Sequence, residues 1–236
     1  MPTFALLLFL MSITLLPNSA IAKSSACFGT TANGRLENGV RLPLNGNNFT
    51  TYSHLAHGLG RTYVHSEVKE IMLDAYQALE QEQPEKVFKY AETGFENGGL
   101  FKPHKTHQNG LSVDFMTPVI NTEKNIKGSA KGQSVHLPTN PLNKLGYNIE
   151  FDKNGIYKHY QIDYVAMAAH IVALHKQAKK RGYDLWRVIF DPDLQAGLFK
   201  TQYASYLKKN IQLSKKKSWV RHDEHYHVDF SIPCKK

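Results

Sequence analysis

The sequence predicts one α+β domain. Two amphipathic helical segments alternate with short apolar runs typical of strands, and neither an internal repeat nor a linker divides the chain. The 236 residues are enough to bury a sizeable core, and 42% hydrophobic with 21% charged residues lies in the globular range. This composition excludes a disordered chain, a collagen-like chain and a disulfide-dense miniprotein.

The first 22 residues have the pattern of a secretory signal peptide. A short apolar run from Phe4 to Leu16 precedes Pro17, and the small-x-small sequence Ala20-Ile21-Ala22 follows. The run is too short for a membrane span, although no Lys or Arg precedes it. We therefore expect export, cleavage after Ala22, a mature domain over 23–236 and no stable membrane insertion afterwards.

Two cysteines lie at opposite ends of the predicted mature chain, Cys27 and Cys234. In an oxidising compartment such a pair favours a disulfide that ties the termini together. A lipoprotein anchor at Cys27 is less favoured, because Ser24 stands where a large aliphatic residue is expected. Metal ligation by such distant thiols is less favoured still.

The elements of the first half follow in order. Residues 28–48 are rich in Gly, Asn and Pro, which indicates ordered coil or short strands. The apolar spacing over 66–82 predicts a helix with Ser66 as N-cap, and Pro84 ends it. Strands are expected over 87–90 and 111–115, with a loop over 94–99 between them.

The second half begins with a polar, loop-like segment over 121–153. The clearest helix spans 163–180, with an apolar face, lysines at its C-terminal end and Gly182 as its stop. A strand over 185–190, a helical segment over 192–209 and a final strand over 226–232 complete the prediction.

The 12 histidines are unusually numerous, and five of them form two clusters. His104 and His107 are in the first cluster, and His222, His225 and His227 are in the second. The scattered others are expected to be structural or solvated: His54, His57, His65, His136, His159, His170 and His175.

Strand alternation sorts the second cluster. His225, His227 and Asp229 share one face of the last strand, while Tyr226, Val228 and Phe230 share the apolar face. Two imidazoles on one face suit joint zinc ligation, or one ligand beside an acid/base group. A polar outer face is the alternative.

The first cluster, which contains His104 and His107, favours a metal site over a polar outer face. His107, Gly110 and Asp114 form the pattern H-x-x-G-x-x-x-D, in which Gly110 permits a sharp turn that lets His107 and Asp114 converge. An Asp in such an apolar strand is costly unless it meets a cation or a strong partner. His107, Asp114 and His227 would complete the three protein ligands of a hydrolytic zinc site.

These two motifs in this order resemble the lysostaphin and D-alanyl-D-alanine group of zinc peptidases, and within it the penicillin-insensitive murein endopeptidases. The resemblance covers most of the mature chain. It extends to Cys27, to residues 61–65, to Gly98-Gly99, to residues 188–192 and to His222.

The resemblance implies a small, mainly antiparallel sheet that carries a zinc site and is flanked by helices. It also implies a periplasmic enzyme that cleaves D-alanyl-diaminopimelate cross-links of peptidoglycan, with zinc held by His107, Asp114 and His227. His225 would act as general base or stabilise the oxyanion, and His222 would orient the site. The related alternative is a D-alanyl-D-alanine carboxypeptidase or dipeptidase.

Two further residues have open roles. Glu224 stands where dipeptidase relatives carry a catalytic Glu, but alternation turns it away from the face of His225 and His227, so His225 is preferred as base. His104 is expected either beside the ligands or on the surface.

A net charge of +9 and the basic runs at 179–181 and 215–217 leave a second class of function open, a non-catalytic cell-wall-binding module. Nucleic-acid binding is disfavoured, because no recognition motif is present and an exported protein seldom meets that ligand.

Overall fold

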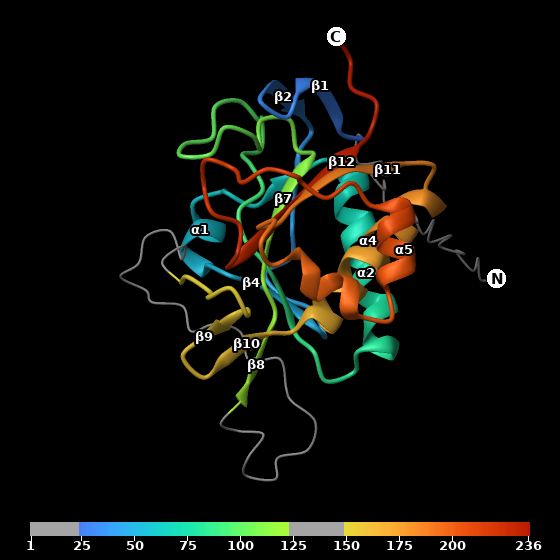
Figure 1. The fold of residues 1–236 in the computed structure, drawn as a ribbon. Helices are drawn as coiled ribbons and strands as arrows, with labels where there is room; N and C mark the ends of the chain where they lie inside the picture. Colours follow the sequence, from blue (N-terminus) through green and yellow to red (C-terminus); the bar gives the residue numbers. More distant parts are fainter. Residues whose placement is uncertain (1–23, 123–148) are drawn as a thin grey trace, which may run out of the picture.

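A central five-stranded sheet organises the protein, whose computed structural model describes residues 24–122 and 149–236 (Figure 1). The strand order is β11-β12-β7-β6-β4. The predicted signal peptide over 1–22 and most of the predicted loop over 121–153 lie outside the described residues. Mainly antiparallel sheets flanked by helices confirm the predicted α+β class.

Strand β12 (His225–Ser231) lies inside the central sheet and pairs antiparallel with β7 (Ser112–Met116) and β11 (Asp184–Ile189). β7 pairs with β6 (Phe88–Tyr90), which runs parallel to β4 (Phe49–Thr51). All four predicted strands are therefore present, with bounds shifted by one residue or so. β4 was not predicted, because it lies between the stretch assigned to 28–48 and the helix predicted over 66–82.

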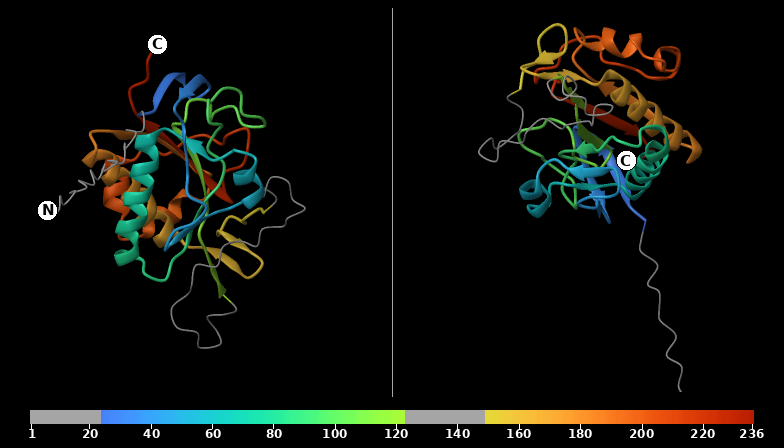
Figure 2. Two further views of the ribbon diagram at one scale, coloured as in Figure 1. Left: turned by 180° about the vertical axis from the view of Figure 1, so that it is seen from behind. Right: turned by 90° about the horizontal axis from the view of Figure 1, so that it is seen from below.

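Two long helices, α2 (Ser66–Glu82) and α4 (Tyr164–Lys180), lie side by side against the sheet (Figures 1 and 2). The apolar spacing predicted the buried face of α2, but in α4 the predicted Val165 is 41% exposed. The N-cap of α2 is His65 rather than Ser66, because the Nδ1 atom of His65 accepts the amide of Glu67 at 3.2 Å. Asp163 caps α4 in the same way, through the amide of Ala166 at 3.0 Å.

The helical segment expected over 192–209 is divided. A 3-10 helix, η1 (Gln195–Lys200), and a short helix, α5 (Ala204–Asn210), are separated by an extended Thr201 with a ψ of 166°. The break lets each piece bury one leucine, Leu198 and Leu207, against α4. The prediction of one continuous helical segment over 192–209 was therefore wrong.

Short elements surround this core. The Gly- and Asn-rich N-terminal stretch forms a hairpin of β1 (Ala26–Thr30) and β2 (Asn33–Glu37), and β3 (Val40–Arg41) pairs with β5 (Tyr63–Val64). Helix α1 (His54–Gly58) follows β4. A third small sheet joins three strands, β8 (Val119–Asn121), β9 (Ile156–Tyr157) and β10 (Tyr160–Ile162).

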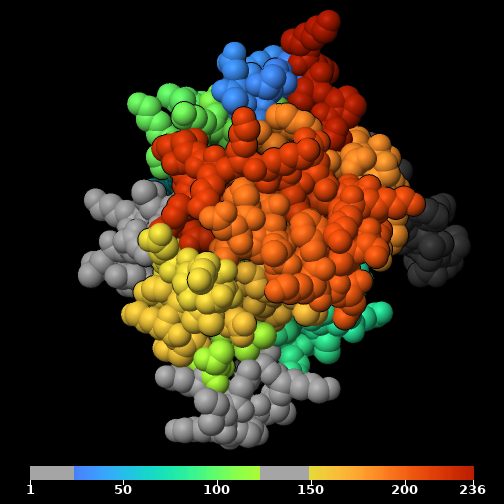
Figure 3. All heavy atoms as spheres, viewed as in Figure 1, coloured from blue at the N-terminus to red at the C-terminus, as the bar shows by residue number. Residues whose placement is uncertain are grey.

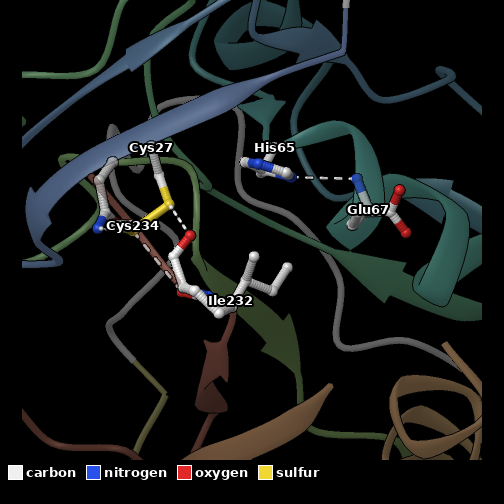
Figure 4. The surroundings of a disulfide bond; sticks show 7 residues. Cys27, His65, Glu67, Ile232 and Cys234 are labelled. Atoms are coloured by element: carbon white, nitrogen blue, oxygen red, sulfur yellow. Dashed lines mark hydrogen bonds between the residues drawn. A yellow bond between two sulfur atoms is a disulfide. The ribbon is translucent and has the colours of Figure 1, made fainter. Parts of the chain in front are cut away.

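Cys27 and Cys234 form a disulfide, as predicted (Figure 4). The amide of Lys235 donates to the carbonyl of Cys27 at 2.9 Å, and the amide of Gly29 donates back to the carbonyl of Lys235 at 3.1 Å. The two ends of the described chain are thus joined covalently and by main-chain hydrogen bonds. Among the described helices, none has the length and apolar character needed to cross a membrane.

Candidate metal centre

The register of β12 against β7 brings the predicted site residues together. His227 lies opposite Asp114, and Asp229 lies opposite Ser112. The alternation predicted for the last strand is confirmed, since Tyr226 stacks on Phe115 of β7 on the core side, with 5.5 Å between ring centroids. The imidazoles of β12 therefore face away from the helices.

His107 reaches the same place from the loop before β7. Its backbone has a φ of 69°, and Gly110 follows at 77°. A side chain at Gly110 would place its Cβ 2.7 Å from the backbone nitrogen of His65, so only glycine fits this turn. The turn lets His107 and Asp114 converge, as the spacing predicted.

The protonation of His107 is fixed by its surroundings. Its Nδ1 lies 3.1 Å from the carbonyl oxygen of Thr93, which can only accept, so Nδ1 carries the proton. Burial lowers the pKa of His107, although Asp114 opposes the shift, so the ring is neutral. The unprotonated Nε2 then faces the Oδ1 of Asp114 at 3.3 Å.

Two electron-rich atoms that face each other in a buried site need a cation between them. His107 is fully buried, and Asp114 is 1% exposed. The Nε2 of His107 and the Oδ2 of Asp114 make no hydrogen bond within the described part of the chain. Because an orphaned buried acceptor is costly, this pair fits a bound metal ion.

His227 lies between two carboxylates. Its Nδ1 is 2.8 Å from the Oδ1 of Asp114, and its Nε2 is 2.8 Å from the Oδ1 of Asp229. Burial alone would lower the pKa of His227, but the charges of Asp229 and Asp114 outweigh it and raise the pKa to about 10. Burial would raise the pKa of Asp114, but the surrounding histidines, His107 and His227 above all, outweigh burial and hold that pKa well below its usual range.

His104 belongs to the same cluster. Ligating atoms of His104, His107 and Asp114 all lie within 4.8 Å of one another, so this trio could hold a metal ion. The structure therefore presents two overlapping ligand sets, which share His107 and Asp114 and differ in whether His104 or the predicted His227 completes them.

The contacts of His104 distinguish it from His227. Its Nε2 lies 2.6 Å from a carboxylate oxygen of Glu92, while its Nδ1 is 3.6 Å from the Oδ2 of Asp114. Glu92 is also paired with Arg61, whose guanidinium lies 4.0 Å from the ring centroid of Phe101. No spacing rule links Glu92 or Arg61 to the histidines, so neither was predicted as a site residue.

His225 and His222 lie next to this cluster, with 4.6 Å between their ring centroids. Burial lowers the pKa of His225 to about 4. Burial, together with the neighbouring His225, lowers that of His222 to about 3. Both rings are neutral at physiological pH and can accept a proton.

Glu224 stands behind His225. It is 1% exposed, and its Oε1 lies 3.2 Å from the Nδ1 of His225. Burial raises the pKa of Glu224, and burial together with Glu224 raises that of Asp223 to about 6. Glu224 does not line the cleft, as alternation predicted, but it contacts the base candidate.

A cavity of about 460 Å³ opens over the cluster and is lined by His104, Asp114, Arg187, His222, His225 and His227, among others. Lys105 and the exposed Trp219 form its rim, with the Lys105 Nζ 4.9 Å from the Trp219 ring centroid. In Figure 3, the green segment that includes Lys105 meets the red segment before β12 on this side of the molecule. A substrate can therefore approach the cluster from solvent.

Asp229 connects the cluster to β11. Its Oδ1 also accepts the hydroxyl of Ser112 at 2.5 Å, and its Oδ2 accepts the Nε of Arg187 at 2.5 Å. A carboxylate that holds the far nitrogen of a histidine fixes its tautomer and orientation. Asp229 was placed on the correct face by alternation, but its partners came from strand pairing.

Of two comparisons with known proteins, one found a match. A search of curated protein sequences found no match. The family model of penicillin-insensitive murein endopeptidases matches residues 27–236, which include every residue of the cluster and both cysteines. The chain belongs to the penicillin-insensitive murein endopeptidase family.

Proposed function

We propose that this protein is an exported zinc endopeptidase that hydrolyses the D-alanyl-diaminopimelate cross-links of peptidoglycan. One observation carries the proposal: the Nε2 of His107 lies 3.3 Å from the Oδ1 of Asp114 and has no hydrogen-bond partner among the described residues, and Asp114 lines an open cavity. The family supplies the substrate class, murein.

His107, Asp114 and His227 are the proposed ligands. Two imidazole nitrogens and one carboxylate are a common zinc donor set that leaves a coordination position open. The Nδ1 of His227 already lies 2.8 Å from Asp114, and Asp229 holds its Nε2. Bound zinc at this place supplies a Lewis acid and lowers the pKa of a water molecule.

His225 is the proposed general base. It is neutral, lines the cavity and is held from behind by Glu224, so it can take the proton of the attacking water and pass it to the leaving amine. His222, which is also neutral, would orient the water or the scissile carbonyl. No covalent acyl-enzyme is required, so β-lactams have no nucleophile to acylate.

Three observations support action on the cell wall outside the cytoplasm. The first 22 residues have the signal-peptide pattern, and the Cys27–Cys234 disulfide is typical of an oxidising compartment. The net charge of +9 favours attraction to an anionic polymer, an effect that salt screens. Periplasmic localisation is therefore part of the proposal.

The test combines metal analysis with digestion of purified cross-linked muropeptide dimers. We expect one zinc per chain and conversion of dimers to monomers, abolished by a chelator and restored by zinc, with product masses that identify the D-alanyl-diaminopimelate bond. Release of only a terminal D-alanine would instead show a carboxypeptidase. Binding to murein without cleavage by the zinc-loaded protein would show a binding module and overturn the proposal.

A further inference from the structure

Arg187 is a cation of the cavity wall that the proposed mechanism does not use. It lies on β11 opposite Asp229, on the same side of the sheet as His227, and it lines the cavity above the cluster. Its side chain is 31% exposed, whereas Asp229 is fully buried. The guanidinium is thus anchored at one end and open to the cavity at the other.

The contact with Asp229 leaves the two Nη atoms of the Arg187 guanidinium available. The Nε of Arg187 donates to Asp229 at 2.5 Å, and this is the one hydrogen bond of the guanidinium within residues 24–122 and 149–236. The ring of Trp186 lies 4.3 Å from the guanidinium carbon and restricts its motion. The two Nη atoms can then donate in parallel, the geometry that matches a carboxylate.

The negative charge of Asp229 does not cancel the positive charge of Arg187. Its Oδ1 is already engaged by His227 and Ser112, so Arg187 shares Asp229 with two other donors. Lys105 is the other Lys or Arg among the described residues that line the cavity, but it is exposed at the rim and lies over Trp219. Arg187 is therefore the one held close to the reacting groups.

We propose that Arg187 is a specificity-determining residue that binds a carboxylate of the peptidoglycan stem peptide. The inference rests on the proposed function, because that substrate supplies the ligand. Two carboxylates of a cross-linked dimer are compared as ligands of Arg187: the one beside the leaving amine of diaminopimelate, and that of a terminal D-alanine.

The test compares three dimers: one with both carboxylates free, one amidated beside the leaving amine and one amidated at the terminal D-alanine. The zinc-loaded mature protein should lose about 10- to 100-fold in kcat/KM on one amidated dimer, the range expected for a lost charged hydrogen bond. The dimer affected identifies the carboxylate that is bound.

Three variants locate the effect. Arg187→Gln, which keeps an N–H for Asp229, should cleave the free and amidated dimers at equal rates, and Arg187→Lys should regain part of the preference. Lys105→Gln is the matched control and should keep the preference. Equal rates for all dimers in the wild type, or a preference that persists in Arg187→Gln, would overturn the inference.

Two further measurements separate this inference from its alternatives. Zinc content should be the same in Arg187→Gln as in the wild type. If zinc is lost together with the preference, Arg187 acts only through Asp229 and His227, and the inference fails. Binding of a muropeptide monomer with free carboxylates can be measured by calorimetry and needs no turnover. Its affinity should weaken about tenfold or more in Arg187→Gln, even if the protein cleaves no dimer.

Discussion

The Nδ1 of His227 lies 2.8 Å from the Oδ1 of Asp114, although 113 residues separate them in the chain. The contact follows from the antiparallel register of β12 and β7, in which these residues are directly opposite. It places a second imidazole beside the His107–Asp114 pair, and so it decides how a metal ion would be held.

Removal of His227 should therefore abolish metal binding. We expect His227→Ala to lose stoichiometric zinc and at least about 10³-fold in kcat/KM, because one of three ligands is missing. His104→Ala should keep zinc with about 10- to 100-fold weaker affinity, the usual cost of losing a group that only supports the ligands. Zinc affinity is measured by chelator competition.

The exposed His54 provides the control, since His54→Ala removes an imidazole that does not line the cavity. The reverse order, with zinc lost in His104→Ala and kept in His227→Ala, would show that His104, His107 and Asp114 are the ligands.

The two candidates for the base should separate clearly. His225→Ala is expected to lower kcat by about 10²- to 10⁴-fold, as removal of a general base does. Glu224→Gln should cost less than about tenfold, because Glu224 stays behind His225 and does not line the cavity. Single-turnover rates on a muropeptide dimer measure both. A larger loss in Glu224→Gln than in His225→Ala would assign the base to Glu224.

The turn at Gly110 should tolerate no side chain. In Gly110→Ala the new Cβ meets the backbone nitrogen of His65 at 2.7 Å, and the φ of 77° is strained as well. We expect a loss of about 2–4 kcal/mol in the free energy of unfolding, together with weaker zinc binding.

Gly99→Ala is the matched control for that variant. Gly99 has a similar φ of 81°, but nothing lies within 4 Å of its Cβ position. Gly99→Ala should lower the free energy of unfolding, measured with urea, by about 1–2 kcal/mol, because it introduces backbone strain alone. Equal losses in the two variants would show that the clash with His65 is relieved by a small shift.

Acid should destabilise the protein through His170. This ring is fully buried between Tyr76 and Phe88, and burial lowers its pKa to about 3. The unfolded chain has the ordinary value of about 6.5, so it binds one more proton between these two values. Stability from His170 is therefore complete above about pH 6.5 and is lost as the pH falls towards 3.

The expected slope from this residue is about 1.4 kcal/mol per pH unit in the middle of that range. Urea unfolding of the wild type and His170→Phe between pH 4 and 7 measures it. The variant should show a slope smaller by about this amount, even if its stability at pH 7 is lower. Identical slopes would contradict a neutral His170 in the folded state.

The disulfide should stabilise the fold without contributing to the site. It closes a loop of 207 residues, and the double variant Cys27→Ser/Cys234→Ser should lose roughly 2–5 kcal/mol in the free energy of unfolding. Zinc content should stay at the wild-type level, because β12 is held on both sides by strand pairing. Loss of zinc in the folded double variant would show that the termini also position His227.

Much of this architecture was predictable from local patterns. The helices over 66–82 and 164–180 follow from apolar spacing, and the orientation of His225, His227 and Tyr226 follows from alternation along one strand. The Cys27–Cys234 pairing followed because the chain has only two cysteines. The caps were less predictable, since the side chain of His65, rather than that of Ser66, accepts the amide of Glu67 at the start of α2.

The sequence by itself determined which residues could form a metal site, because the turn at Gly110 and the period of two in a strand are local properties of the backbone. Only the tertiary structure decided which groups meet. The contacts of His104 with Glu92, and of Arg187 with Asp229 and thus His227, depend on loop packing and strand register. Such contacts join distant segments, and their geometry is set by the whole core rather than by any spacing along the chain.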